Sequence, residues 1–288
     1  QMSQKIPREL LFGNPEKASP KVSPDGRNWA YLAPDEGVLN IWTGPEGGAA
    51  QPLTRDRGRG IRQFFWAEDQ RSVLYVHDKD GDENWHLYQT DLSSGKTTDL
   101  TPVPGAQAQV VGTEPRFPDE ILVALNDRDP RAHDVYRVSL KDGSRRLEAK
   151  NPGDVIGWLP DLDFKIGAAK AMRPDGGSVL RLRDGAGWRD FLTCGPDDQI
   201  GAHGFAPDKT HIFVESSLDR DTTALLAMSL DGRSVKILAE DPDSDLGGVL
   251  IHPRDYHVEA VSFEADRVRW QVLDPKLEAD FAAFASLD

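Results

Sequence analysis

Short apolar runs recur along this chain at a nearly constant spacing, and this repeat constrains its fold more than any other feature. The first series begins with Trp29-Ala30-Tyr31-Leu32 and returns about every 45 residues, close to the length of one four-stranded propeller blade. A second series follows the first, and several of its members alternate apolar and polar residues, as half-buried strands do. The two series occupy residues 29–32, 73–76, 121–125, 166–169, 212–214 and 258–261, and residues 40–42, 86–88, 134–138, 179–182, 225–228 and 268–272.

The segments between the runs repeat as well. Turn-forming sequences such as Ser23-Pro24-Asp25-Gly26 and Ala206-Pro207-Asp208-Lys209 precede the first series, because proline presets φ and Asp or Gly favours a tight turn. Hairpin-like segments such as Leu140-Lys141-Asp142-Gly143 follow the second series. Each unit therefore reads strand, turn, strand, loop, strand, turn, strand.

We predict an all-β fold, a β-propeller of four-stranded blades. About six blades are visible, as part of a seven-bladed propeller, and a short helix over about 275–286 follows them because apolar residues there recur at helical spacing. A β-sandwich with fortuitously even strand spacing is the alternative, but sandwiches need no repeated turn chemistry. The predicted propeller domain is 1–288, with no hydrolase domain, and its approximate blades are 19–54, 61–101, 106–149, 154–193, 199–239 and 247–274.

Charge and composition exclude several classes of partner. The net charge of −14, from 48 acidic and 34 basic residues, disfavours attraction to phosphate backbones and anionic lipid, so we expect neither nucleic acid nor a membrane. The single cysteine, Cys194, forms no internal disulfide. No apolar stretch approaches the roughly 20 residues of a membrane span. The expected compartment is the cytoplasm by default, or the periplasm or the exterior if a leader has been removed.

Motifs that carry catalysis are absent from the sequence. There is no Gly-x-Ser-x-Gly nucleophile elbow, no phosphate-binding glycine loop and no His-Glu-x-x-His metal motif. We therefore predict no catalytic residue, no cofactor and no metal site in this chain. These motifs leave open whether the parent protein is an enzyme. The histidines lie in no recognisable triad context; they are His77, His86, His133, His203, His211, His252 and His257.

The most charged loop is the candidate functional site. It separates the two strand series of the second blade, and its alternating carboxylates resemble the start of a calcium loop. The glycine comes too early for such a loop and the later acidic ligand is missing, so a solvated turn is the favoured interpretation. The predicted substrate-entrance or interdomain residues are Asp78, Asp80, Asp82, Glu83, Asn84 and Trp85.

Tryptophan is frequent in this chain and allows two interpretations. The seven indoles could stack on sugars or bases, but most fall in or beside predicted strands. Because adjacent twisted sheets need large apolar wedges, packing between blades is the favoured interpretation.

The segment from His77 to Tyr88 resembles the propellers of the prolyl oligopeptidase family, particularly acylaminoacyl-peptidase and dipeptidyl-aminopeptidase-like bacterial members. The opening Ile6–Pro15, the following Ser19–Gly26 and the exit Leu273-Asp274-Pro275 resemble the same family. The resemblance implies an N-terminal propeller that limits access to a C-terminal α/β-hydrolase domain, which would carry the catalytic serine, aspartate and histidine. None of these catalytic positions exists in this chain.

Three functions follow as hypotheses. The first is a non-catalytic, substrate-gating and scaffolding propeller of a serine peptidase that hydrolyses short peptides or N-terminally blocked residues, with the hydrolase domain and peptide substrates as partners. The second is a freestanding propeller that binds a protein partner, similar to the propeller of the periplasmic Tol system. The third, a small-molecule propeller enzyme, predicts carboxylates or histidines clustered at one mouth of the channel. The fold alone does not select among them.

Overall fold

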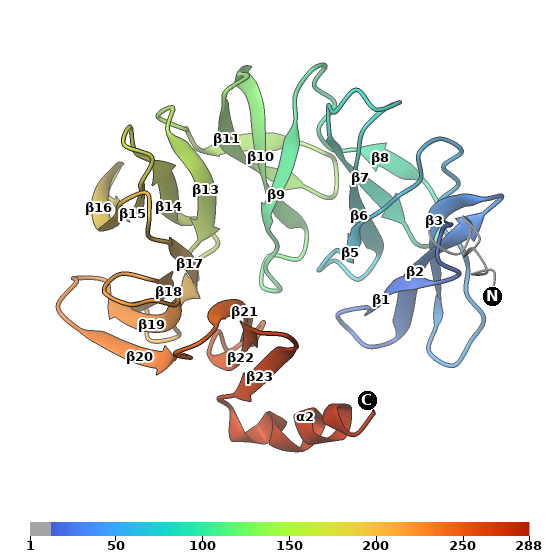
Figure 1. The fold of residues 1–288 in the computed structure, drawn as a ribbon. Helices are drawn as coiled ribbons and strands as arrows, with labels where there is room; N and C mark the ends of the chain where they lie inside the picture. The colour runs from blue at the N-terminus through green and yellow to red at the C-terminus, as the bar shows by residue number, and fades with distance from the viewer. Residues whose placement is uncertain (1–12, 288) are drawn as a thin grey trace, which may run out of the picture. The chain divides into compact units, whose positions relative to one another are not determined.

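A computed structural model describes residues 13–287, and it is a β-propeller, as the sequence predicts. Within these residues the chain forms six antiparallel sheets, five of four strands and one of three, and strands that are neighbours in the sequence are neighbours in each sheet (Figure 1). The opening segment 6–12, part of the predicted family resemblance, lies outside the described residues.

The chain divides into two compact units, residues 1–147 and 148–288. The first unit holds three sheets, the last of which ends just beyond its boundary. Their strands are β1 (Ala18–Val22), β2 (Asn28–Asp35), β3 (Val38–Pro45) and β4 (Gln51–Pro52); β5 (Phe64–Trp66), β6 (Ser72–His77), β7 (His86–Asp91) and β8 (Thr97–Asp99); and β9 (Ala108–Gly112), β10 (Glu120–Asp129), β11 (Ala132–Ser139) and β12 (Arg145–Ala149).

The second unit holds the other three sheets and the helical exit. Its elements are β13 (Val155–Pro160), β14 (Ile166–Met172), β15 (Ser178–Asp184) and β16 (Gly187–Cys194); β17 (Ile200–Phe205), β18 (His211–Ser216), β19 (Ala224–Ser229) and β20 (Val235–Ala239); β21 (Asp245–Ile251), β22 (Val258–Glu264) and β23 (Val268–Val272); and then η1 (Pro275–Leu277) and α2 (Glu278–Ala285).

The two predicted series of apolar runs are confirmed as the second and third strands of the six sheets. The second strands are buried on both faces over most of their length, because successive side chains of a strand point to opposite sides, whereas β23 is an exposed edge strand. In β6, Leu74 packs against the third sheet, whereas Val73 and Tyr75 pack against the first sheet. The second sheet is thus held between its two neighbours, and the cores of the first unit lie between sheets (Figure 1).

The sixth sheet departs from the four-stranded pattern. After β23 the chain enters η1 and α2 where a hairpin would lead to a fourth strand, because Asp274 caps the backbone N–H of Lys276 and Pro275 occupies the first helical turn. The predicted helix is confirmed, and Phe281 lies 5.5 Å from Trp270 of β23 between ring centroids. No helix among residues 13–287 has the length and apolar content to cross a bilayer.

Among the tryptophans, Trp66 shows the predicted packing between blades. Trp66 is buried and donates its indole N–H to the carbonyl of Lys21, 3.2 Å away in the first sheet. Trp29 stacks on Tyr31 at 5.0 Å. Trp85 and Trp270 are instead 38% and 48% exposed. The remaining tryptophans, Trp29, Trp42, Trp158 and Trp188, are half-buried, so the exposure of Trp85 has to be explained by its surroundings.

The packing between sheets predicts the effect of a single truncation. Leu87 is fully buried between the second and third sheets, so Leu87→Ala should lower the free energy of unfolding by about 2–5 kcal/mol through lost apolar contact and a residual cavity. Urea denaturation measures this. The control is Leu147→Ala, at a position 54% exposed, which should change stability by less than about 0.5 kcal/mol. Equal effects of the two substitutions would contradict the assigned core.

The turn after β7 predicts a pH dependence. Hydrogen bonds from the Ser93 hydroxyl, and then from the backbone and hydroxyl of Ser94, lower the pKa of Asp91 from 3.8 to about 2. Ser93→Ala combined with Ser94→Ala should raise this pKa toward 3.8, as a carboxyl titration by NMR will show. Because the folded-state pKa is the lower one, the stabilisation is complete above about pH 4 and disappears as the pH falls through about 2. A stability difference that persists below that pH would refute the assignment.

Candidate functional site

The candidate site lies at one edge of the second sheet. Because neighbouring strands are antiparallel, the start of β5, the end of β6 and the start of β7 meet at this edge. Two segments therefore come together there: residues 54–63, which lead into β5 and are called the connector, and residues 78–85, called the acidic loop. The acidic loop contains every residue predicted as a site from the sequence.

The connector is fixed to the first sheet by buried polar contacts. The side-chain oxygen of Asn40, which is fully buried, accepts hydrogen bonds from the Thr54 hydroxyl at 2.9 Å and from the Asp56 N–H at 2.6 Å. Gly60 donates its N–H to the Asp56 carboxylate at 2.7 Å. Gly60 has a φ of +80°, and an added Cβ would lie 3.1 Å from backbone atoms of Leu39, so glycine is needed here.

Asp78 joins the acidic loop to the connector. Its side chain is only 3% exposed, and its Oδ2 lies 2.9 Å from Nη1 of Arg59 and 3.3 Å from the N–H of Glu83. The guanidinium of Arg59 also lies against Gly81, where an added Cβ would be 2.8 Å from Nη1. The predicted entrance residue Asp78 is therefore a structural anchor, and its charge is already compensated.

The other polar residues of the loop fall into two groups. Asp82 accepts hydrogen bonds from the backbone N–H and side-chain amide of Asn84 at 3.0 and 3.1 Å, and the backbone bond is the main cause of its lowered pKa. Asp80 and Glu83 are exposed, and their carboxylates have no partner in the described part of the chain. Both lie in the left-handed region, with φ of 55° and 59°. Asp78 and Asp82 thus shape the loop, whereas Asp80 and Glu83 face solvent.

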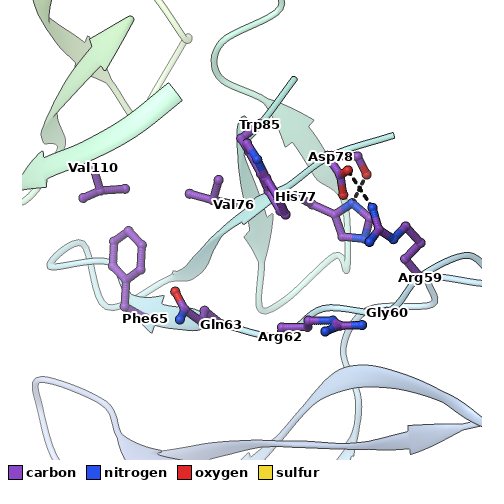
Figure 2. Close-up of a pocket in the computed structure, with 10 residues that line it drawn as sticks. All are labelled: Arg59, Gly60, Arg62, Gln63, Phe65, Val76, His77, Asp78, Trp85 and Val110. Carbon is purple, nitrogen blue, oxygen red and sulfur yellow. Dashed lines mark hydrogen bonds and ion pairs between the residues drawn. The ribbon is translucent and has the colours of Figure 1, made fainter. Parts of the chain in front are cut away.

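A cavity of about 740 Å³ lies between the acidic loop, the connector and the third sheet (Figure 2). Its apolar wall consists of Phe65, Val76, Trp85 and Val110, and the last two are 38% and 37% exposed. Of the predicted site residues, Asp78 and Trp85 line this cavity. The other four, Asp80, Asp82, Glu83 and Asn84, do not.

Most residues of the polar wall of the cavity were not predicted from the sequence. It contains Arg59, Arg62, Gln63 and His77 in addition to Asp78. The Nε2 atom of His77 lies 3.6 Å from an Asp56 carboxylate oxygen, and its Nδ1 contacts the Asp78 carbonyl. The alternation of Arg and Gly over residues 57–60, followed by Arg62 shortly before a strand, is the signal that could have identified this wall.

Histidine and carboxylate side chains also gather in the sixth sheet, which the sequence did not predict. Two overlapping groups have ligand atoms within 4.8 Å of one another: His252, Asp255 and His257, and His257, Glu259 and Asp274. His252 Nδ1 already accepts the backbone N–H of Asp255 at 2.9 Å, and His257 Nε2 lies 2.9 Å from Asp274. These contacts show that His252 stabilises a turn and that His257 pairs with Asp274, the residue that caps η1.

Two curated relatives are similar to nearly the whole chain. Dipeptidyl aminopeptidase BIII of Pseudoxanthomonas mexicana is 39% identical over 280 residues, which are 96% of this chain and 41% of that protein. Dipeptidyl peptidase family member 6 of Caenorhabditis elegans is 26% identical over 278 residues, 89% of this chain and 37% of that protein. The chain thus spans about two fifths of the length of these relatives. No protein-family model matches the chain.

Solved structures share the fold at low sequence identity. A prolyl endopeptidase superposes with a TM-score of 0.66 at 14% identity, over 90% of this chain and 41% of that one. The β-propeller domain of the Trilobed protease from Pyrococcus furiosus gives a TM-score of 0.57 at 17% identity, over 90% of this chain and 84% of that one. These structures support the propeller fold.

The contacts of Asp78 predict that it stabilises the fold, whereas Asp80 in the same loop does not. Asp78→Ala should destabilise the chain by about 1–3 kcal/mol, because Arg59 and the Glu83 N–H both lose a buried acceptor. Asp80→Asn is the control, since Asp80 is exposed and asparagine also tolerates its left-handed backbone, and it should change the free energy of unfolding by less than about 0.5 kcal/mol. Thermal and urea unfolding measure both. Equal losses, or a silent Asp78→Ala, would contradict the anchoring role.

Proposed function

Because this chain is a β-propeller related to the propeller domains of prolyl oligopeptidase-family peptidases, we propose that it is the non-catalytic, substrate-gating domain of a serine peptidase. The peptidase would hydrolyse short peptides or N-terminally blocked residues, and a hydrolase domain of the same polypeptide would perform the catalysis. The observation that carries the proposal is the cavity beside the acidic loop, in a chain that is 39% identical to part of a dipeptidyl aminopeptidase.

The size and lining of the cavity support contact with a small ligand. Ligand sites in proteins are typically concave, mostly apolar and about 300–1,000 Å³ in volume, with a few polar groups that fix orientation. The cavity of about 740 Å³, with its aromatic wall of Phe65 and Trp85, fits this description. It can accommodate a few residues of an extended peptide and excludes a folded protein, which is the selection that gating requires.

The arrangement of the acidic loop also supports a role at an entrance. Its base is fixed by the pair of Arg59 and Asp78, whereas Glu83 and Trp85 are exposed. A fixed base places the exposed side chains reproducibly beside the cavity, so they can contact an entering peptide without being needed for folding. Binding residues are often carried on loops that a rigid scaffold holds in place.

Kinetics of the complete peptidase that contains this chain test the proposal. Trp85→Ala and Glu83→Ala should each change the ratio of kcat/KM between a dipeptide substrate and a longer peptide by about threefold or more, since both side chains would contact only the longer peptide. Trp270→Ala is the control, because Trp270 is also exposed but lies in the sixth sheet.

Unchanged ratios for both loop variants across several peptides would refute gating by this loop. A complete protein that lacks peptidase activity, and instead retains a protein partner through this chain, would favour the freestanding interaction propeller.

A further inference from the structure

The two arginines of the cavity differ in their partners. Arg59 is paired with the buried Asp78 at 2.9 Å. Arg62 is exposed, and among residues 13–287 it has neither an ion pair nor a hydrogen bond. Among the arginine and carboxylate side chains of the lining, Arg59 and Arg62 are positive and Asp78 is negative, so the charge of Arg62 is not balanced within the lining. This local excess stands out in a chain with a net charge of −14.

Arg62 stands at the same cavity as the aromatic wall. Phe65 follows it by three residues in the same segment, and the indole of Trp85 lies across the cavity from Phe65, as Figure 2 shows. Gln63, exposed between them, adds an amide that can both donate and accept hydrogen bonds. The cavity therefore offers a guanidinium that can pair with an anion and an apolar surface that can hold a side chain.

We propose that this cavity binds the C-terminal residue of a short peptide, with Arg62 pairing with the free carboxylate and with Phe65 and Trp85 holding an apolar side chain. Carboxylate and side chain share one Cα in such a residue, and the one cavity that Arg62, Phe65 and Trp85 line can receive both groups. The inference rests on the proposed function for its ligand class, and it defines the substrates as short peptides that end in an apolar residue.

The acidic loop contributes one carboxylate to the cavity lining, and that carboxylate is paired. Asp80, Asp82 and Glu83 lie outside the cavity lining, and Asp78 is compensated by Arg59. An aspartate or glutamate side chain next to an apolar residue would present similar chemistry but would separate the carboxylate from the apolar group by additional bonds. A binding measurement can therefore distinguish a C-terminal carboxylate from a side-chain carboxylate.

Calorimetry with the chain itself tests the assignment, using N-acetylphenylalanine, its amide, and N-acetyl-aspartyl-phenylalanine amide. The free acid should bind about tenfold or more tightly than the amide, as expected for a charge-assisted hydrogen bond. Arg62→Gln should abolish this difference without changing the affinity for the amide. Trp85→Ala should weaken acid and amide by the same factor. Lys79→Gln, which removes an exposed cation that does not line the cavity, should leave the preference for the acid intact.

Several results would overturn the proposal: equal binding of acid and amide, a preference that survives Arg62→Gln, or no binding of any probe. If N-acetyl-aspartyl-phenylalanine amide bound as tightly as N-acetylphenylalanine, the assignment of the cavity to a C-terminal carboxylate would be overturned. None of these measurements involves hydrolysis, so they fail or succeed independently of the gating experiment on the complete peptidase. Thermal unfolding of each variant confirms that the fold is retained.

Discussion

The ion pair between Arg59 and Asp78 connects two segments that the sequence separates by 19 residues, and the geometry of the candidate site depends on it. Asp78 is 3% exposed, so its charge is tolerated only because a guanidinium and a backbone N–H satisfy it. The guanidinium in turn needs the space that Gly81 leaves. One side of the cavity comes from the connector and another from the acidic loop, and this pair holds them at a fixed separation.

The sheet supplies both the core and the cavity from the same strands. Phe64 and Tyr75 are buried against the first sheet, whereas Phe65 and Val76, each the next residue along its strand, line the cavity. Phe65 and Val76 also pack against the core between the second and third sheets, so the same side chains support the sheet packing and form the wall of the cavity.

The sequence predicts strands better than it predicts the site, for a physical reason. Apolar runs such as 73–76 and turns such as Ser23–Gly26 depend on local periodicity and backbone preference, so their positions follow from neighbouring residues. Trp85 and Asp78, two residues of the predicted entrance loop, line the cavity, whereas the carboxylate of Asp82 accepts hydrogen bonds from Asn84 within the turn. Arg62 and Val110 reach the cavity only through packing of the second and third sheets, which no local pattern encodes.

The central claim is that the cavity beside the acidic loop is the peptide-contacting surface of this propeller. An NMR titration of the isotope-labelled chain with short peptides tests it most directly, because seven indole N–H signals report on seven different places. The account predicts that the Trp85 signal, assigned through Trp85→Phe, shifts first and saturates with peptide. Shifts confined to Trp270, or no shift at Trp85 while other indole signals saturate, would contradict it.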